Sequence, residues 1–377
     1  MPPKSKKPSI LPSSYSFLSS TTLCSLWSNY GSISRLTVSH DSNDTPTPTT
    51  LILKSILPPP ASSADESHLR KLISYRVERY FYSTLSPLLS PLTHTKVATS
   101  IAIDDSTGEL LIEDLSPSYP VTSYGSLNLA TTTAVLKWLA GFHGTFWASA
   151  ISSSSSNVNI GTPIPAPLTV SSPTTTNGIW QRGGYWYLAT RGDEYSALLD
   201  SGDYDWLLPW VKDVDARIEN EKKEWKTLVH GDVKAANILL NSAPKTGSNS
   251  GEKEEGIRAA LYDFQYCGIA TPAVDLVYFL GTTVDRKSLA DFEGLLRIYY
   301  NELCSAYAIS HDGRKLEEDL GYTYEVLKEQ WDVAVVDWLR FMAGWGCWGN
   351  WRWIESCAKE VVSRWEAEGR QPLKEAS

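Results

Sequence analysis

The sequence has little of what defines several specialised protein classes. It contains five cysteines (Cys24, Cys267, Cys304, Cys347 and Cys357), and no two of them form a Cys-x-x-Cys pair. We therefore expect neither a disulfide framework nor a zinc site, and interpret the cysteines as reduced thiols of a cytoplasmic protein. Lys4, Lys6 and Lys7 are not followed by an apolar run, so no secretory signal is expected.

Long apolar segments and a basic excess are also absent. The most apolar stretch, Phe341–Trp351, is flanked by Asp337 and Arg352 and is too short to cross a bilayer, so we interpret it as buried helix and expect no membrane partner. The net charge of −9 argues against a nucleic-acid partner, which needs a basic face. With 42% hydrophobic and 20% charged residues, the chain has the composition of an ordinary globular protein.

The first third of the chain carries mainly strand signals. Residues 1–14 are rich in Pro, Ser and Lys and are predicted to be a disordered tail. A helix is predicted from the capping-box pair Ser63 and Glu66 onward. The strand predictions cover Trp27–Val38 with a turn at Gly31, Leu51–Ile56, and the pair Lys96–Ile103 and Glu109–Ile112.

The rest of the chain is mainly helical in pattern. Helices are predicted over Leu127–Phe142, over Tyr195–Asn220 and through most of the chain beyond residue 275, and Ser152–Asn177 reads as a low-complexity surface loop. Strands with one helix, followed by helices, indicate an α+β protein with two lobes. The predicted lobes are a small antiparallel-sheet lobe over 15–115 and a larger, mainly helical lobe over 116–370.

Two acidic motifs carry the sharpest chemical signal. The first is His230-Gly231-Asp232-Val233-Lys234-Ala235-Ala236-Asn237, and the second is Asp263-Phe264-Gln265. Ile238–Leu240 and Ala259–Tyr262 can pair as a hairpin, which would bring Asp232, Asn237 and Asp263 together. An Asp can orient a hydroxyl and accept its proton, and Asn and Asp oxygens suit Mg²⁺. This is the chemistry of phosphoryl transfer.

The pattern resembles the aminoglycoside/choline kinase-like phosphotransferases of the protein-kinase-like superfamily, including their ecdysteroid kinase-like branch. The resemblance rests on His-Gly-Asp-(x)₄-Asn, Asp-Phe-Gln and the downstream run Asp275–Leu280. It implies a bilobal kinase-like fold that uses ATP and Mg²⁺ to phosphorylate a small-molecule alcohol.

The resemblance also implies roles for individual residues. Asp232 would be the catalytic base, Lys234 would contact the γ-phosphate, and Asn237 and Asp263 would hold Mg²⁺. Asp275 would brace the catalytic loop by hydrogen bonds. His230 would bond within the loop and transfer no proton.

Upstream positions would complete the nucleotide site. Lys54, in a predicted strand, would contact ATP phosphates and pair with Glu78 on the following helix. The alternative is an edge-strand lysine and a solvated glutamate.

Two further segments are candidates for nucleotide contact. Gly31 and Ser32 would cover the phosphates, although this turn has one glycine and is equally well an ordinary hairpin. The backbone at Glu113 and Leu115 would bind adenine, or else simply end a strand.

Several features separate the chain from protein kinases. Gln265 replaces the glycine of Asp-Phe-Gly, and Asp275 follows only 12 positions after Asp263, which leaves no room for an activation segment. A small-molecule kinase is therefore favoured over a protein kinase, and a pseudokinase without turnover is the other alternative. The acceptor stays open among choline-like, sugar, aminoglycoside and steroid alcohols, and so does the oligomeric state. The aromatic cluster Trp345, Trp348, Trp351 and Trp353 is interpreted as core packing in preference to an aromatic cage for a cation.

Overall fold

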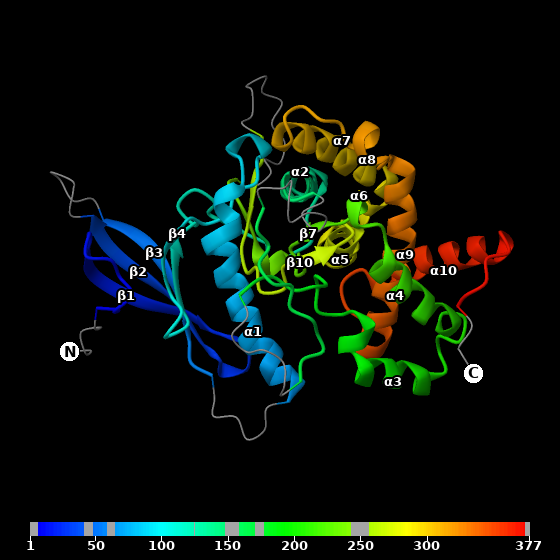
Figure 1. Cartoon of the computed structure of the whole chain (residues 1–377), viewed down its shortest axis with the longest axis horizontal. Coiled ribbons are helices and arrows are strands. Elements are labelled where there is room, and N and C mark those ends of the chain that lie inside the picture. Colours follow the sequence, from blue (N-terminus) through cyan, green and yellow to red (C-terminus); the bar gives the residue numbers. More distant parts are fainter. Residues whose placement is uncertain are drawn as a thin grey trace.

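A five-stranded antiparallel sheet forms the N-terminal part of the protein in a computed structural model (Figure 1). The structure describes residues 7–40, 48–58, 65–123, 125–147, 158–169, 177–242 and 256–373. The strand order is β1-β2-β3-β5-β4. The strands are β1 (Tyr15–Ser25), β2 (Gly31–His40), β3 (Pro48–Ile56), β4 (Ser100–Asp104) and β5 (Glu109–Glu113).

Gly31 opens β2 and does not form the hairpin turn, which differs from the prediction. The turn between β1 and β2 consists of residues 26–30. Gly31 has φ of +141°, and a Cβ there would lie 1.9 Å from the carbonyl oxygen of Ser55 on β3. The glycine is therefore required for the close approach of β2 to β3.

The sheet has a small core of its own. This core contains Leu36, Val38, Leu51, Leu53 and Leu111, together with Ile10 and Leu11. Residues 7–14 are therefore ordered and not part of a disordered tail as predicted for 1–14, because the side chains of Ile10 and Leu11 are buried on the sheet. Residues 1–6 lie outside the described part.

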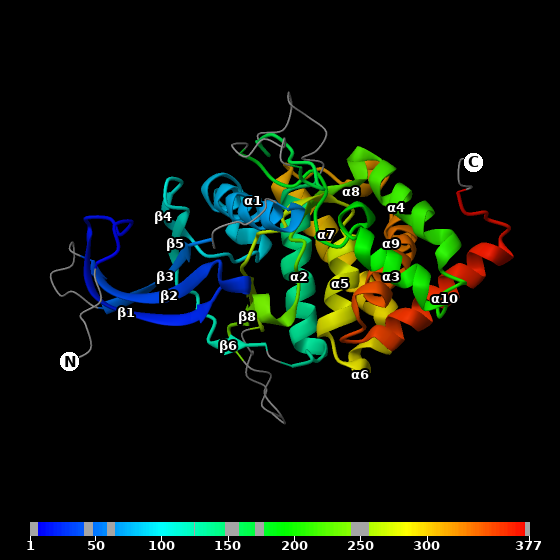
Figure 2. The same cartoon turned by 90° about the horizontal axis from the view of Figure 1, so that it is seen from below.

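Helix α1 (Glu66–Tyr80) lies between the sheet and the helical part of the molecule (Figures 1 and 2). Its N-cap is Asp65, whose side chain accepts a hydrogen bond from the backbone N–H of His68 at 2.7 Å. The predicted cap residue, Ser63, lies outside the described residues.

The C-terminal part is mainly helical, with short strands inserted. The helices are α2 (Leu129–Thr145), α3 (Gly192–Ser201), α4 (Val211–Asn220), α5 (Ala273–Thr283), α6 (Arg286–Leu289), α7 (Phe292–Ser310), α8 (Leu316–Leu320), α9 (Tyr324–Trp345) and α10 (Trp351–Ala367). The strands are β6 (Val121–Thr122), β7 (Thr227–Val229), β8 (Ile238–Leu240), β9 (Ala259–Leu261) and β10 (Gly268–Ala270). The single helical segment predicted over Tyr195–Asn220 is two helices, because the chain turns at Gly202 with φ of +69°.

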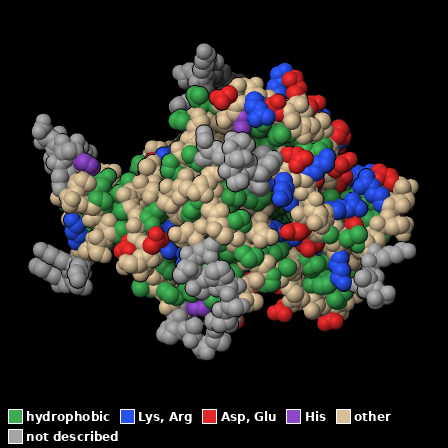
Figure 3. Space-filling view, in the orientation of Figure 1, with side chains coloured by type: hydrophobic (Ala, Val, Ile, Leu, Met, Phe, Trp, Pro, Cys, Tyr) green, Lys and Arg blue, Asp and Glu red, His purple; other side chains and the backbone are tan. Residues whose placement is uncertain are grey.

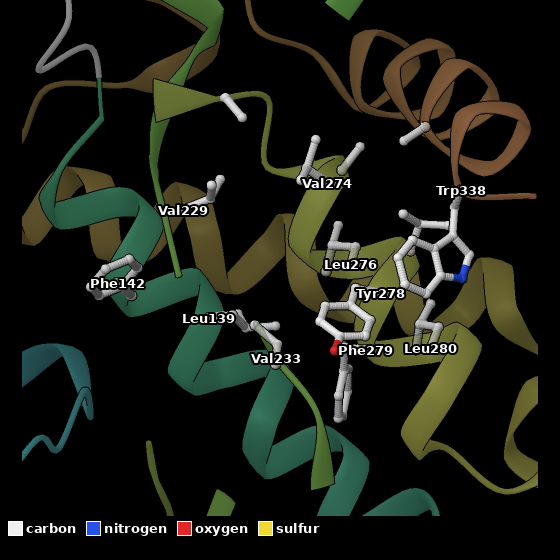
Figure 4. Packing of buried hydrophobic residues seen from close by; sticks show 14 of the residues in the cluster. Leu139, Phe142, Val229, Val233, Val274, Leu276, Tyr278, Phe279, Leu280 and Trp338 are labelled. Carbon is white, nitrogen blue, oxygen red and sulfur yellow. The ribbon is translucent and has the colours of Figure 1, made fainter. Parts of the chain in front are cut away.

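One large core unites these helices. Figure 4 shows the part of it where side chains of α2, β7, α5 and α9 meet. The buried face of α1, with Leu69, Ile73, Val77 and the adjoining Phe81, belongs to this large core and not to that of the sheet. The predicted α+β architecture, a small antiparallel sheet with one helix and a larger helical part, is confirmed.

Surface composition follows the same division. On the face drawn in Figure 3, charged side chains of both signs are interspersed over the helical part. Within the described part of the chain, none of the helices combines the length and the apolarity that a membrane crossing requires.

Candidate active site

The loop after β7 is held by a buried aspartate on α5. Asp275 is fully buried, and its carboxylate accepts hydrogen bonds from the backbone N–H groups of His230 (2.7 Å) and Gly231 (2.9 Å). The imidazole Nε2 of His143 lies 3.1 Å from the same carboxylate. Gly231 has φ of +79°, and a Cβ there would lie 2.2 Å from the carbonyl oxygen of Tyr266. The predicted bracing role of Asp275 is confirmed.

His230 is fixed as a neutral imidazole. Its Nε2 lies 3.0 Å from the carbonyl oxygen of Tyr262, so Nε2 must carry the proton, and its Nδ1 accepts from the backbone N–H of Asp232 at 3.2 Å. Burial lowers the pKa of His230, which keeps the ring neutral. The bond at Nδ1 lies within the loop, as the sequence predicts, whereas the bond at Nε2 joins the loop to Tyr262 after β9.

Asp232 is surrounded by donors. Tyr278 of α5 donates to Oδ1 at 2.7 Å. The Lys234 ammonium lies 2.7 Å from Oδ2, and the Asn237 amide nitrogen lies 3.0 Å from the same atom. Burial would lower the pKa of Lys234, but the Asp232 carboxylate outweighs it and raises that pKa. The carboxylate is therefore oriented, and it is flanked by a cation whose side chain is 43% exposed.

The predicted hairpin brings the two motifs together. β8 pairs antiparallel with β9, with Ile238 opposite Leu261, and the N–H of Tyr262 donates to the carbonyl of Asn237 at 3.2 Å. Asp263 follows directly, in the left-handed conformation with φ of +70°. Such a conformation costs about 1–3 kcal/mol for a residue other than glycine and is typical of functional sites.

Gln265 connects Asp263 to α1. Its amide nitrogen donates to Asp263 Oδ1 at 2.6 Å, and its amide oxygen accepts from the hydroxyl of Ser74, a fully buried residue of α1, at 3.0 Å. Trp180 Nε1 donates to the Gln265 carbonyl at 2.8 Å. Phe264 stacks on Phe81 with ring centroids 3.7 Å apart. The Asp-Phe-Gln segment is thus fixed to the end of α1 on one side and to residue 180 on the other.

Lys54 joins the sheet to both acidic groups. Its ammonium lies 2.6 Å from Glu78 Oε2 and 3.4 Å from Asp263 Oδ1. Burial would lower the pKa of Lys54, but the Asp263 and Glu78 carboxylates outweigh it and raise that pKa. Burial raises the pKa of Glu78 to about 7 against the opposing effect of Lys54. The predicted Lys54–Glu78 ion pair is confirmed, and the alternative of two solvated charges is wrong.

The pKa of Asp263 shifts in the opposite direction. Burial would raise it, but Lys54 and Lys234 outweigh burial and lower it, so the carboxylate is anionic. The side-chain amide nitrogen of Asn237 donates to Asp232. The side-chain oxygen Oδ1 of Asn237 is therefore the atom suited to a metal. One carboxylate and one amide oxygen fit Mg²⁺, which usually completes its shell with water and phosphate oxygens. Among the described residues, no group of three or more His, Cys, Asp or Glu could hold a metal alone.

The remaining candidates lie on strands of the sheet or directly after one. Gly31 and Ser32 pair with Ile56 and Ser55, the residues that follow Lys54 on β3. Glu113 ends β5, and its carboxylate binds the Lys96 ammonium at 2.7 Å.

The backbone carbonyl of Leu115 is already occupied by hydrogen bonds within the protein. The Leu115 carbonyl accepts from the N–H groups of Ser118 and Tyr119, so only its N–H would suit an adenine. Contact of Gly31, Ser32, Glu113 or Leu115 with a nucleotide stays a prediction.

Sequence reasoning missed Tyr278, Tyr185, Ser74 and the bridging role of Gln265. Tyr278 could have been found, because it lies three residues after Asp275 and so on the same face of a helix. Tyr185, whose hydroxyl lies 3.2 Å from that of Tyr278, comes from a separate segment with no local signal.

The tryptophan cluster packs largely as predicted. Trp348, Trp351 and Trp353 lie against the large core, whereas Trp345 is 53% exposed.

A small sheet whose lysine pairs with a helix glutamate, next to two segments that present Asp232, Asn237 and Asp263, defines a kinase-like protein. The chain belongs to the ecdysteroid kinase-like family, whose family model matches residues 28–164 and 197–309. No curated protein matches the sequence.

Three solved structures are similar at low identity. A Plasmodium vivax ethanolamine kinase has 11% identity and a TM-score of 0.39, with 94% of this chain and 84% of that chain covered. The GDP and kanamycin complex of APH(2″)-IIIa has 10% identity and a TM-score of 0.39, with 94% of each chain covered. An aminoglycoside-3′-phosphotransferase of type VIII has 15% identity and a TM-score of 0.33, with 84% of this chain and 94% of that chain covered. At these values the structures say nothing about the substrate of this chain.

Proposed function

We propose that the protein is an ATP-dependent phosphotransferase that moves the γ-phosphoryl group to a hydroxyl of a small-molecule acceptor. The observation that carries the proposal is the convergence of Lys54, Asp232, Asn237 and Asp263 where the sheet meets the helical part. These groups supply a cation for phosphate, a base for a hydroxyl and oxygen ligands for a metal, which together make up the apparatus of phosphoryl transfer. The proposed location of this reaction is the cytoplasm.

The nucleotide would bind between the sheet and the helical part. Lys54, held by Glu78, would contact its phosphates, and Asn237 and Asp263 would hold Mg²⁺. Bound there, the metal would neutralise charge on the phosphate oxygens. Lys234, whose ammonium is partly exposed, can leave Asp232 for a γ-phosphate oxygen.

Asp232 would act on the acceptor. Once Lys234 turns toward phosphate, Asp232 Oδ2 becomes available to a hydroxyl, while the bond from Tyr278 to Oδ1 keeps the carboxylate oriented. The hydroxyl donates its proton to Asp232 as its oxygen bonds to the γ-phosphorus, and ADP leaves. This direct in-line transfer predicts inversion at a chiral γ-phosphate, and retention would contradict it.

The test uses the purified full chain with ATP, Mg²⁺ and an extract of small metabolites. Asp232→Asn should lower transfer by about 10²–10⁴-fold, as expected for the loss of a general base. Asp263→Asn should abolish transfer. Glu318→Gln, which changes an exposed carboxylate paired with Lys315, is the control and should stay active.

The outcomes separate the proposed enzyme from its alternatives. Both active-site variants should unfold at a temperature close to that of the wild type, so that lost transfer reports chemistry. If Asp232→Asn transfers phosphate at the rate of the wild type, the assigned mechanism is wrong. Nucleotide binding by the wild type without transfer to any acceptor would instead indicate a pseudokinase.

A further inference from the structure

Arg191 occupies the aromatic region beside the catalytic loop. Its guanidinium lies 5.2 Å from the ring centroid of Tyr185, 5.7 Å from that of Phe341 and 5.2 Å from that of Trp345. The Arg191 side chain is 9% exposed, and its closest carboxylate oxygen, on Glu194, is 3.4 Å away. The protein therefore supplies its own cation to these rings, and a cationic substrate group would meet a like charge there.

Arg70 approaches the same region from α1. Arg70, Ser74 and Glu78 recur every four residues, are all buried, and so share one face of the helix. Ser74 bonds to Gln265 and Glu78 to Lys54, which places Arg70 one turn further along this face of α1.

The Arg70 guanidinium has incomplete partners. Its Nη2 lies 3.5 Å from Glu66 Oε2, and its buried Nη1 has no hydrogen-bond partner among the residues that the structure describes. Close charge-assisted bonds measure about 2.7–2.9 Å. A buried guanidinium N–H without an acceptor is unfavourable, so this group is suited to an incoming acceptor atom.

The two arginines lie within electrostatic range of each other and of the catalytic loop. Burial lowers the pKa of Arg191, and the charge of Arg70 lowers it further. Burial raises the pKa of Tyr266. The charges of Arg70 and Arg191 lower this pKa, and the charge of Asp232 raises it.

Ring and hydroxyl contacts connect this region to the base. The Tyr266 ring lies 5.1 Å from that of Tyr185, whose hydroxyl lies 3.2 Å from the Tyr278 hydroxyl that bonds to Asp232. Tyr266, Tyr185 and Tyr278 thus connect the region of the two arginines to Asp232.

We propose that Arg70 and Arg191 form a subsite for an anionic group carried by the acceptor, so that the substrate is an alcohol bearing a carboxylate, sulfate or phosphate. This rests on the proposed function and narrows its substrate class. Arg191 donates its Nε–H to the Tyr185 carbonyl at 2.7 Å, but each arginine reaches its glutamate only at 3.4 to 3.5 Å, which is longer than a close charge-assisted bond. Planar guanidinium groups match anions such as these with paired N–H bonds. The anion would bind between α1 and the segment at Tyr185, with the acceptor hydroxyl at Asp232.

The first experiment measures anion binding without catalysis. Sodium sulfate should raise the unfolding temperature of the wild type in a saturable way, relative to sodium chloride of equal ionic strength. Arg70→Gln and Arg191→Gln should each lose this rise. Arg352→Gln is the matched control, because Arg352 is exposed and lies over the ring of Trp351. Equal stabilisation of all four proteins, or of none, would overturn the subsite.

The second experiment measures acceptor choice with pairs of alcohols that differ only in one anionic group. The wild type should prefer the anionic member by about 10- to 100-fold, the ratio expected for a charged hydrogen bond. Arg70→Gln should remove the preference while ATP hydrolysis in water persists, and Arg191→Lys, which keeps the charge, should retain part of it.

The outcomes distinguish the subsite from the function. Sulfate binding through both arginines without acceptor preference would mean that the site takes a free anion, and would refute the acceptor claim. Efficient transfer to neutral alcohols with no sulfate binding would refute the subsite and leave the phosphotransferase standing. If the wild type neither transfers phosphate nor hydrolyses ATP, the proposed function fails, and the acceptor claim fails with it.

Discussion

Replacing Asp275 with Asn should loosen the catalytic loop without touching the reacting groups. The two carboxylate oxygens of Asp275 each accept one hydrogen bond, from the backbone N–H of His230 at 2.7 Å and from that of Gly231 at 2.9 Å. An asparagine offers one oxygen and one NH₂ group, so whichever way it turns, one backbone N–H faces a donor. A buried N–H left without an acceptor costs about 1–3 kcal/mol. Loss of the charge also weakens the remaining bonds, which brings the expected total to about 3 kcal/mol.

Amide hydrogen exchange is the direct assay, because it reads the affected groups individually. The amides of His230 and Gly231 should exchange about 100-fold faster in Asp275→Asn, the factor that corresponds to about 3 kcal/mol. Amides of α10, distant from this loop, serve as the internal control. Phosphate transfer should fall as well, because Asp232 follows directly in the loop. If transfer disappears while both exchange rates stay unchanged, Asp275 takes part in the chemistry and the bracing account is wrong.

Three further predictions follow from the same centre. Gln265→Leu and Ser74→Ala should each raise the Mg²⁺ concentration needed for half-maximal transfer, and their effects should be less than additive in the double variant; full additivity would show that the bridge is not a unit. Lys54→Met should destabilise the fold by about 3–5 kcal/mol at pH near 9. The loss should be smaller near pH 5, because Glu78, with its raised pKa, can then take up a proton; thermal unfolding at both pH values checks this, and equal losses would contradict it. The stability that neutral His230 contributes should be complete above pH of about 6.5 and should decline as the pH falls toward the lowered pKa of His230. His230→Gln should therefore reduce the loss of stability at acid pH, measured by thermal unfolding as a function of pH. An unchanged loss would mean that other groups cause it.

The chemistry-bearing residues could be predicted because their positions follow local rules. A strand on each side of a loop forces Asn237 and Asp263 together, and helical spacing after β3 supplies a partner for Lys54. These constraints involve neighbours in the sequence or in the sheet. They hold whatever the rest of the chain does.

The supporting residues could not be predicted in the same way. Ser74 meets Gln265, and Arg191 meets Trp345, only after distant segments pack together. Composition also misled at the N-terminus, where Pro and Ser predicted disorder although Ile10 is buried on the sheet. The signal of Gly202, which separates α3 from α4, was present in the sequence and was outweighed by the helical pattern on either side.

The division of the apolar cores has a consequence for nucleotide exchange. Helix α1 contributes Leu69, Ile73 and Val77 to the core of the helical part, but its Tyr75 packs with Leu26 and Tyr30 beside the sheet. The Lys54–Glu78 bond also joins α1 to β3, and the stack of Phe81 on Phe264 joins the end of α1 to the Asp-Phe-Gln segment. Because α1 is held from both sides, we expect Glu78 to keep its position when a nucleotide enters or leaves.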